Sequence, residues 1–476
     1  MVGYRNRNLR FDWYLVICYL LLVFIGWINI YAAMYSDTHT SIFDLSQKCG
    51  MQFIWMLISF GSAILVMFII NEKTYSVLST IIYILVCALL FAVIFLGREV
   101  SGSKSWFELG PVRFQPAEIS KISTSLLLAY TMSKYGFKLT RLKDALKIAA
   151  IILVPMLLIV MEKETGSALV YCGFIFVLYR EGLSGWILLF GILSIILFIL
   201  TLIFSPLVAI TALLGIYAII YGLYTNQLFK SVLTGTLTIT ALAFLPSIGE
   251  LETFTPIEED TIYYIAAIIS CIIAIFAVTR IWNKRFKHLK LLLISFFCSI
   301  ALIFSVDFIF EKVMQPHQRA RIENLLGITE DLKGIGYNVH QSKIAIGSGG
   351  FIGKGFLEGT QTKFDFVPEQ STDFIFCTIG EEWGFIGSVF LICIYLLLII
   401  RLVILSERQK DKFTYIYGYC VACCIFMHVF INLGMTMGLL PVIGIPLPYV
   451  SYGGSSLLTF TILLFIFIRL DMERWK

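Results

Sequence analysis

The stretch WYLVICYLLLVFIGWINIYAAMY, from Trp13 to Tyr35, is almost entirely apolar and contains no charged side chain. Its length matches the roughly 20 residues that an α-helix needs to cross the hydrocarbon core of a bilayer. It is also longer than the apolar core of a signal peptide. The stretch therefore predicts a first membrane-spanning helix.

Similar apolar runs recur along the chain of 476 residues, which is 59% hydrophobic and only 14% charged. A soluble chain carries about 25% charged residues. A membrane β-barrel would show short alternating segments instead of long apolar runs. We therefore predict an all-α polytopic membrane protein, a single domain over residues 1–476 with about fourteen transmembrane helices. The predicted spans are about 13–35, 52–71, 75–96, 118–134, 147–162, 165–180, 184–204, 207–225, 231–247, 262–282, 290–311, 384–405, 413–435 and 451–470.

The distribution of Lys and Arg predicts the orientation of these spans. The segments KYGFKLTRLKDALK (134–147) and RIWNKRFKHLK (280–290) are strongly basic, and SIGELETFTPIEED (247–260) is acidic. Because short cytoplasmic loops are enriched in basic residues, the pattern places both chain termini in the cytoplasm. It places the long polar loop at 312–372 outside.

The first polar cluster on the predicted outer face is GREVSGSKSWFELGPVRFQPAEISKI (97–122). Pro116 suits the first turn of a helix, which sets Glu118 and Lys121 one turn apart on one face. Ionisable groups in a span usually face the bundle interior or a cavity. An ion pair that fixes helix packing and a role in substrate binding are about equally supported. Trp106 could be an interfacial anchor.

The second cluster, MEKETGSALV (161–170), interrupts an apolar hairpin with Glu162, Lys163 and Glu164. Such a stretch is more often a polar turn than a functional site, and the pattern alone favours the turn.

The third cluster is the loop at 312–372, which is too long for an ordinary connection. Its glycine run GSGGFIGKG (347–355) with a nearby lysine could approach a phosphate, although glycine is also ordinary turn chemistry. The three clusters together suit a lipid-linked anionic substrate, with basic groups for a diphosphate and a carboxylate as general base. Candidate residues in or beside the loop are Asp331, Tyr337, Gln341, Lys343 and Asp373.

Three motifs together resemble the SEDS family of membrane glycosyltransferases, which polymerise peptidoglycan. WFELGPVRFQPAEISKI (106–122) is similar to that family's first external loop, and residues 334–387, from GIGYNVHQSK to EEWGFIG, to its large external loop. NLGMTMGLLPVIGIPLPYVSYGGSS (432–456) is similar to its C-terminal signature. The resemblance covers most of the chain except about 184–311, and GKGFLEGTQ favours the RodA branch, for cell elongation, over the FtsW branch, for division.

The resemblance implies a peptidoglycan glycosyltransferase that joins lipid II units at the outer face of the bacterial cytoplasmic membrane. The family's essential acidic residue falls on Asp331, which would deprotonate or orient the attacking sugar hydroxyl in an inverting transfer. A divalent cation, Mg²⁺ or Mn²⁺, could assist, but no ligand set is visible. The implied partners are a class B penicillin-binding transpeptidase and other elongation machinery.

The same resemblance suggests roles for the remaining candidates. Arg113, Lys121 and Lys343 would hold the diphosphate, Glu118 would set Lys121, and Trp106 would line the cavity.

The chain also departs from the family pattern. Leu332 replaces the proline that usually follows the catalytic acid, Ser371 replaces a histidine, and Lys163-Glu164 replaces Pro-Asp. Relatives have about ten spans, so about four extra helices are expected within 184–311.

Two other functions fit the composition. A transporter that flips lipid II would also have many spans and buried charges, but its site usually lies at the membrane midplane and not on one face. A scaffold that only organises the elongation machinery would have no need of Asp331.

Overall fold

The structure is a computed structural model in which the chain forms two compact units. The first comprises Met1–Leu183 and Asp331–Lys476, and the second comprises Ser184–Glu330. The expected single domain stays a prediction. The structure describes residues 11–35, 41–100, 103–109, 112–203, 206–225, 228–243, 287–308, 310, 314, 316–326, 328, 336–364 and 366–473.

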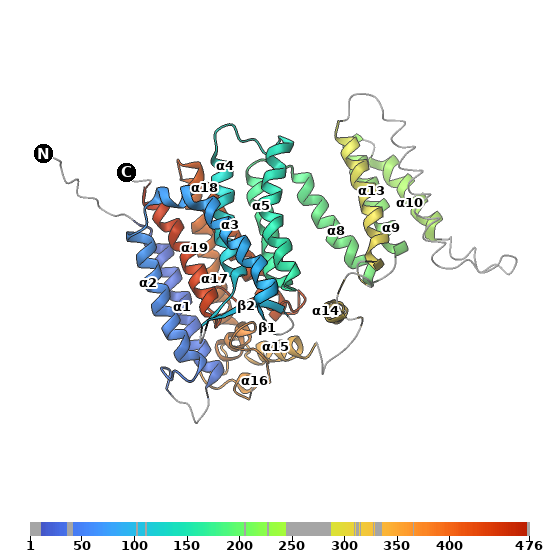
Figure 1. Ribbon diagram of the computed structural model, residues 1–476. Helices are drawn as coiled ribbons and strands as arrows, with labels where there is room; N and C mark the ends of the chain where they lie inside the picture. The colour runs from blue at the N-terminus through green and yellow to red at the C-terminus, as the bar shows by residue number, and fades with distance from the viewer. Residues whose placement is uncertain are drawn as a thin grey trace. The chain divides into compact units, whose positions relative to one another are not determined.

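Long apolar helices form the first unit (Figure 1). Aspartates cap the N-termini of two of them. Asp12 accepts a hydrogen bond from the backbone amide of Leu15, and Asp411 accepts one from the backbone amide of Thr414. The helices are α1 (Trp13–Met34), α2 (Lys48–Phe68), α3 (Glu72–Leu96), α4 (Pro116–Ser133), α5 (Leu142–Met161), α17 (Ile375–Glu407), α18 (Lys412–Thr436) and α19 (Gly454–Met472). A broken helix consists of α6 (Thr165–Val170), the 3₁₀ turn η1 (Tyr171–Gly173) and α7 (Phe174–Arg180).

The centre of this unit is built from α4, α18 and α19. In α18 and α19, 78% of the most apolar window is buried, against 17% in α5, so α5 is peripheral. Fourteen residues of α4 are buried, including six with a hydroxyl or charged side chain. A helix with so many buried polar groups must satisfy them inside the protein, because lipid offers no hydrogen bonds.

The second unit contains α8 (Gly185–Ile203), α9 (Pro206–Thr225), α10 (Leu228–Ala243), α13 (Lys287–Phe308) and α14 (Pro316–Leu325). Its small core includes Leu197, Leu213 and Ile300, and Tyr217 donates a hydrogen bond to Ser295 at 2.7 Å. Four of these helices match predicted spans in 184–311. The predicted span 262–282 lies outside the described residues, so the count of fourteen stays a prediction.

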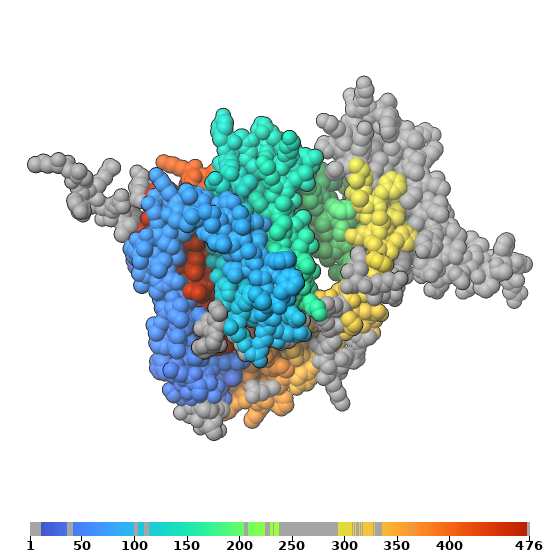
Figure 2. Space-filling view, viewed as in Figure 1, coloured from blue at the N-terminus to red at the C-terminus, as the bar shows by residue number. Residues whose placement is uncertain are grey.

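Eight of the described helices are long and apolar enough to cross a membrane. At one end of the first unit lie α15 (Tyr337–Ser348) and α16 (Thr360–Lys363) of the large loop, with a small antiparallel sheet (Figure 1). The sheet has the order β1 (Arg98–Val100), β2 (Ser103–Leu109), β3 (Val112–Phe114), and the expectation of helices alone did not include it. Figure 2 shows the orange surface of the large loop lying along this end of the unit.

Candidate functional site

The buried charge at the centre of the site comes from α4. Pro116 occupies the first turn of the helix, and Glu118 and Lys121 follow one turn apart. The Lys121 Nζ lies 2.8 Å from Glu118 Oε1, and the side chains are 0% and 3% exposed. The structure therefore brings together the two residues that their spacing had placed on one face.

A third member of this cluster, His428, comes from α18 and was missed in the sequence. Its Nε2 lies 2.8 Å from Lys121 Nζ, and its Nδ1 lies 3.2 Å from the carbonyl oxygen of Pro446. The ring of Phe460 packs against the imidazole with 4.7 Å between ring centroids and lies 5.2 Å from the Lys121 ammonium. One signal was available: His428, Asn432 and Thr436 are polar residues one helical turn apart in an otherwise apolar helix.

That polar stripe of α18, formed by His428, Asn432 and Thr436, connects the site to three other segments. The Asn432 Nδ2 donates to the backbone oxygens of Asp373, at 2.8 Å, and Ile445, at 2.7 Å. The Thr436 carbonyl accepts from Ser342 of α15 at 3.0 Å. The stripe thus contacts the part of the C-terminal signature that follows α18, the segment just before α17, and the large loop.

The turn between α5 and α6 adds two carboxyl groups. Glu164 accepts a hydrogen bond from Ser167 at 2.5 Å, and it lies near both Glu118 and Lys121. Burial raises the pKa of Glu164, and Glu118 contributes to the same shift. Burial, and then Glu164, raise the pKa of Glu162 to about 9. Glu162 is buried and Glu164 is half-buried. The stretch is therefore more than the exposed polar turn that the pattern alone favoured.

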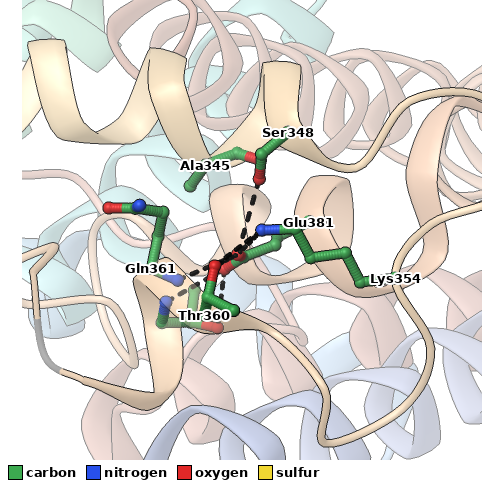
Figure 3. Close-up of polar contacts among 7 residues, drawn as sticks. Ala345, Ser348, Lys354, Thr360, Gln361 and Glu381 are labelled. Carbon is green, nitrogen blue, oxygen red and sulfur yellow. Dashed lines mark hydrogen bonds and ion pairs between the residues drawn. The ribbon is translucent and has the colours of Figure 1, made fainter.

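A second buried carboxylate, Glu381 of α17, fixes the large loop to the helices (Figure 3). It accepts hydrogen bonds from Lys354 Nζ at 2.7 Å and from the backbone amide of Gln361 at 2.9 Å. The backbone amide and hydroxyl of Thr362 also donate to it, both at 2.9 Å. Because these donors come from two separate parts of the loop, one carboxylate determines the path of both.

The glycine run 347–355 has a packing role in the structure. The backbone amides of Lys354 and Gly355 donate to the carbonyls of Glu381 and Glu382, both at 3.0 Å. A Cβ on Gly353 would lie 2.1 Å from the Glu382 carbonyl oxygen, so only glycine permits this approach. These two amides are therefore already bonded within the protein, and a phosphate-binding role for the rest of the glycine run stays a prediction.

The other predicted site residues lie around this end of the unit. Trp106 is half-buried in β2 opposite Arg98, and Arg113 in β3 is in register with Glu108. Tyr337 and Gln341 are half-buried on α15, where Lys343 is exposed.

Two of them also approach glycines of the C-terminal signature. A Cβ on Gly438 would lie 2.2 Å from Lys343 Cε, and one on Gly444 would lie 3.2 Å from the carboxylate of Asp373. Asp331 lies outside the described residues. Within the described part of the chain, no three His, Cys, Asp or Glu side chains gather as a metal site, so a divalent cation stays a prediction.

The fold and the site define a polytopic helical membrane protein with a buried polar cluster beneath a long loop. The chain belongs to the FtsW, RodA and SpoVE family of cell cycle proteins, whose sequence profile matches residues 12–231 and 264–476. It is therefore a multi-pass protein of the cytoplasmic membrane. The matched residues include 184–231 and 264–311. The motifs alone had shown no resemblance within 184–311, so the resemblance covers more of the chain than we expected from the sequence.

Individual relatives agree with this assignment over nearly the whole chain. The chain is 29% identical to the peptidoglycan glycosyltransferase MrdB of Escherichia coli K12, over 92% of this chain and 89% of the relative. It is also 29% identical to the peptidoglycan glycosyltransferase RodA of Treponema pallidum, over 94% of each. The Thermus thermophilus rod shape determining protein RodA shares the fold at 20% identity and a TM-score of 0.54, over 98% of this chain and 99% of that one. A chain from a peptidoglycan synthase complex has a TM-score of 0.61 at 22% identity, with the same coverage.

Proposed function

We propose that this protein joins lipid II units into glycan strands at the outer face of the cytoplasmic membrane. The protein is an enzyme, a peptidoglycan glycosyltransferase that serves cell elongation and rod shape. The full-length similarity to proteins named peptidoglycan glycosyltransferase MrdB and RodA supports this function. The lipid II substrate is the finer part of the proposal.

The reaction would be an inverting glycosyl transfer. The 4-hydroxyl of the acceptor sugar attacks the anomeric carbon of the donor, and the bond from that carbon to the diphosphate oxygen breaks. The hydroxyl proton passes to the carboxylate of Asp331, and undecaprenyl diphosphate leaves with the bonding electron pair. Negative charge develops on the leaving diphosphate, so fixed positive charge near it lowers the barrier.

The observation that carries this mechanism is the Lys121 ammonium, which is completely buried beside Glu118. A buried ammonium is costly to desolvate, and such groups within membrane helices usually serve a function. We assign Lys121, Arg113 and Lys343 to the diphosphate, with Glu118 holding Lys121 in position. The half-buried Trp106, Tyr337, Gln341 and Asp373 would contact the sugars and peptide around this end of the unit.

We further propose that the protein works with a separate class B penicillin-binding transpeptidase and other elongation proteins. The similarity of its fold to a chain from a peptidoglycan synthase complex supports such a partner.

The test is polymerisation of labelled lipid II by the purified protein, with and without its transpeptidase, in detergent with a divalent cation. Asp331→Asn removes the base with almost no change of shape, and we expect no polymer from it. Glu330→Gln is the matched control, because it removes the neighbouring negative charge and should leave polymerisation intact. If no protein makes polymer but liposomes containing the wild type move lipid II across the bilayer, the protein is a transporter and this proposal is wrong.

A further inference from the structure

The imidazole of His428 stands between two groups that fix its proton. The Pro446 carbonyl oxygen can only accept a hydrogen bond, so His428 Nδ1, 3.2 Å away, must carry a hydrogen. The Lys121 ammonium can only donate, so His428 Nε2, 2.8 Å away, must present its lone pair. Only the neutral imidazole with its hydrogen on Nδ1 satisfies both contacts.

We infer that His428 is a positioning residue that holds the Lys121 ammonium through Nε2 and thereby aims it at the substrate diphosphate. This inference rests on the proposed role of Lys121. An ammonium has three N–H groups in tetrahedral directions. Glu118 Oε1 and His428 Nε2 take two of them, from different helices, and the direction of the third is then determined.

A histidine suits this position because it accepts without adding charge. Glu118 already supplies one negative charge to Lys121. A second carboxylate at position 428 would hold the ammonium as well but would make the cluster net negative, which would repel a diphosphate. The neutral imidazole fixes the direction of the Lys121 ammonium without neutralising its positive charge, which then stays available for a diphosphate.

The imidazole is itself held firmly. His428 is 1% exposed, its ring meets the Phe460 ring nearly edge-on, at an interplanar angle of 82°, and its Nδ1 is bonded to the C-terminal signature. The signature, with the sequence PVIGIPLP at 441–448, would therefore influence Lys121 through one side chain.

Two substitutions separate the two contacts of His428. In His428→Gln the side-chain amide reaches the position of Nε2, so it keeps an acceptor for Lys121 and loses the donor to Pro446. In His428→Asn the shorter amide reaches only the position of Nδ1, so it keeps the donor to Pro446 and loses the acceptor. His340→Asn is the control, because the same change is made on an exposed residue of α15.

We expect His428→Gln to retain most of the lipid II polymerisation activity. We expect His428→Asn to lower kcat/KM about ten- to a hundredfold, the usual value of one hydrogen bond to a charged group. His340→Asn should match the wild type. If Asn is active and Gln is not, or if both are active, His428 does not act through Lys121 and the inference is wrong.

A second readout needs no activity. We would label amines in a short pulse and thiols in a parallel pulse, and measure Lys121 and Cys420 by mass spectrometry. The buried Cys420 thiol reports whether the bundle is intact. Lys121 should label faster in His428→Asn than in the wild type while Cys420 stays protected.

This readout also decides the case in which both variants lose activity. If Lys121 labels faster in His428→Asn while Cys420 stays protected, the inference is supported. If the labelling of Lys121 is unchanged, the inference is wrong. If the wild type makes no polymer, the proposed function fails, but the labelling still tests the contact.

Discussion

Replacing Glu381 by glutamine should release the large loop from the helices. Glu381 Oε1 accepts from Lys354 Nζ and the amide of Gln361, and Oε2 accepts from the amide and hydroxyl of Thr362. Glutamine has nearly the same shape, but one of its two terminal atoms becomes an NH₂ group that can only donate. At least one buried backbone amide then faces another donor.

The cost follows from these contacts. An unpaired buried amide costs about 1–3 kcal/mol, and the remaining bonds become neutral and weaken by roughly half. Lys354 is 26% exposed and can turn to water, so its loss adds little. The sum is about 3 kcal/mol, which raises the equilibrium population of the open loop about a hundredfold.

Hydrogen exchange measures this opening directly. In Glu381→Gln the amides of 354–363 should exchange about a hundredfold faster, while the amides of α18 should be unchanged. Glu358→Gln, which removes an exposed carboxylate from the same loop, is the control and should exchange like the wild type. Equal exchange in Glu381→Gln and Glu358→Gln would show that Glu381 does not hold the loop.

Two further predictions follow from the same structure. Gly353→Ala should destabilise the loop far more than Gly350→Ala. Both glycines have a positive φ, but only a Cβ on Gly353 would meet the backbone, 2.1 Å from the carbonyl oxygen of Glu382. Limited proteolysis of the loop would compare the two variants. The pKa of Glu162 is raised to about 9, above its value near 4.3 in the unfolded chain. The folded protein therefore binds this proton more tightly than the unfolded chain does. Its stability falls as the pH rises from about 4.3 to about 9. Glu162→Gln should therefore raise the thermal midpoint in detergent at pH 8 and change it little at pH 4, and an equal change at both pH values would contradict the assignment.

The apolar runs predicted most of the described helices because hydropathy reports which residues face lipid. At the start of α17, hydropathy did not predict the helix. Its span was predicted from residue 384, whereas the helix begins at Ile375. The earlier turns include Glu381 and Glu382, which are buried against the protein and not in lipid, so their polarity conceals the helix. The strands β1 to β3 were missed for a related reason, because three to seven residues in a polar loop carry little periodic signal.

In the candidate site, contacts between residues close in sequence were predictable, and contacts between residues distant in sequence were not. Glu118 and Lys121 were predictable as a pair because helix geometry alone brings residues three apart together. His428 is 307 residues from Lys121, and no spacing rule joins them. The packing role of the glycine run was not predictable from the sequence, because its partners, the carbonyls of Glu381 and Glu382, become available only where α17 bends at Gly384.

These contacts connect two buried carboxylates with different tasks. Glu381 accepts from donors of the large loop, so its charge is used to hold the loop in place. Glu118 gives one oxygen to Lys121, and its other oxygen has no hydrogen-bond partner among the described residues. A buried acceptor without a donor is costly unless a ligand completes it. The Glu381 anchor is therefore complete within the protein, whereas the cluster of Glu118, Lys121 and His428 is left with an open acceptor on Glu118. Our proposal places a substrate hydroxyl and phosphate at that cluster.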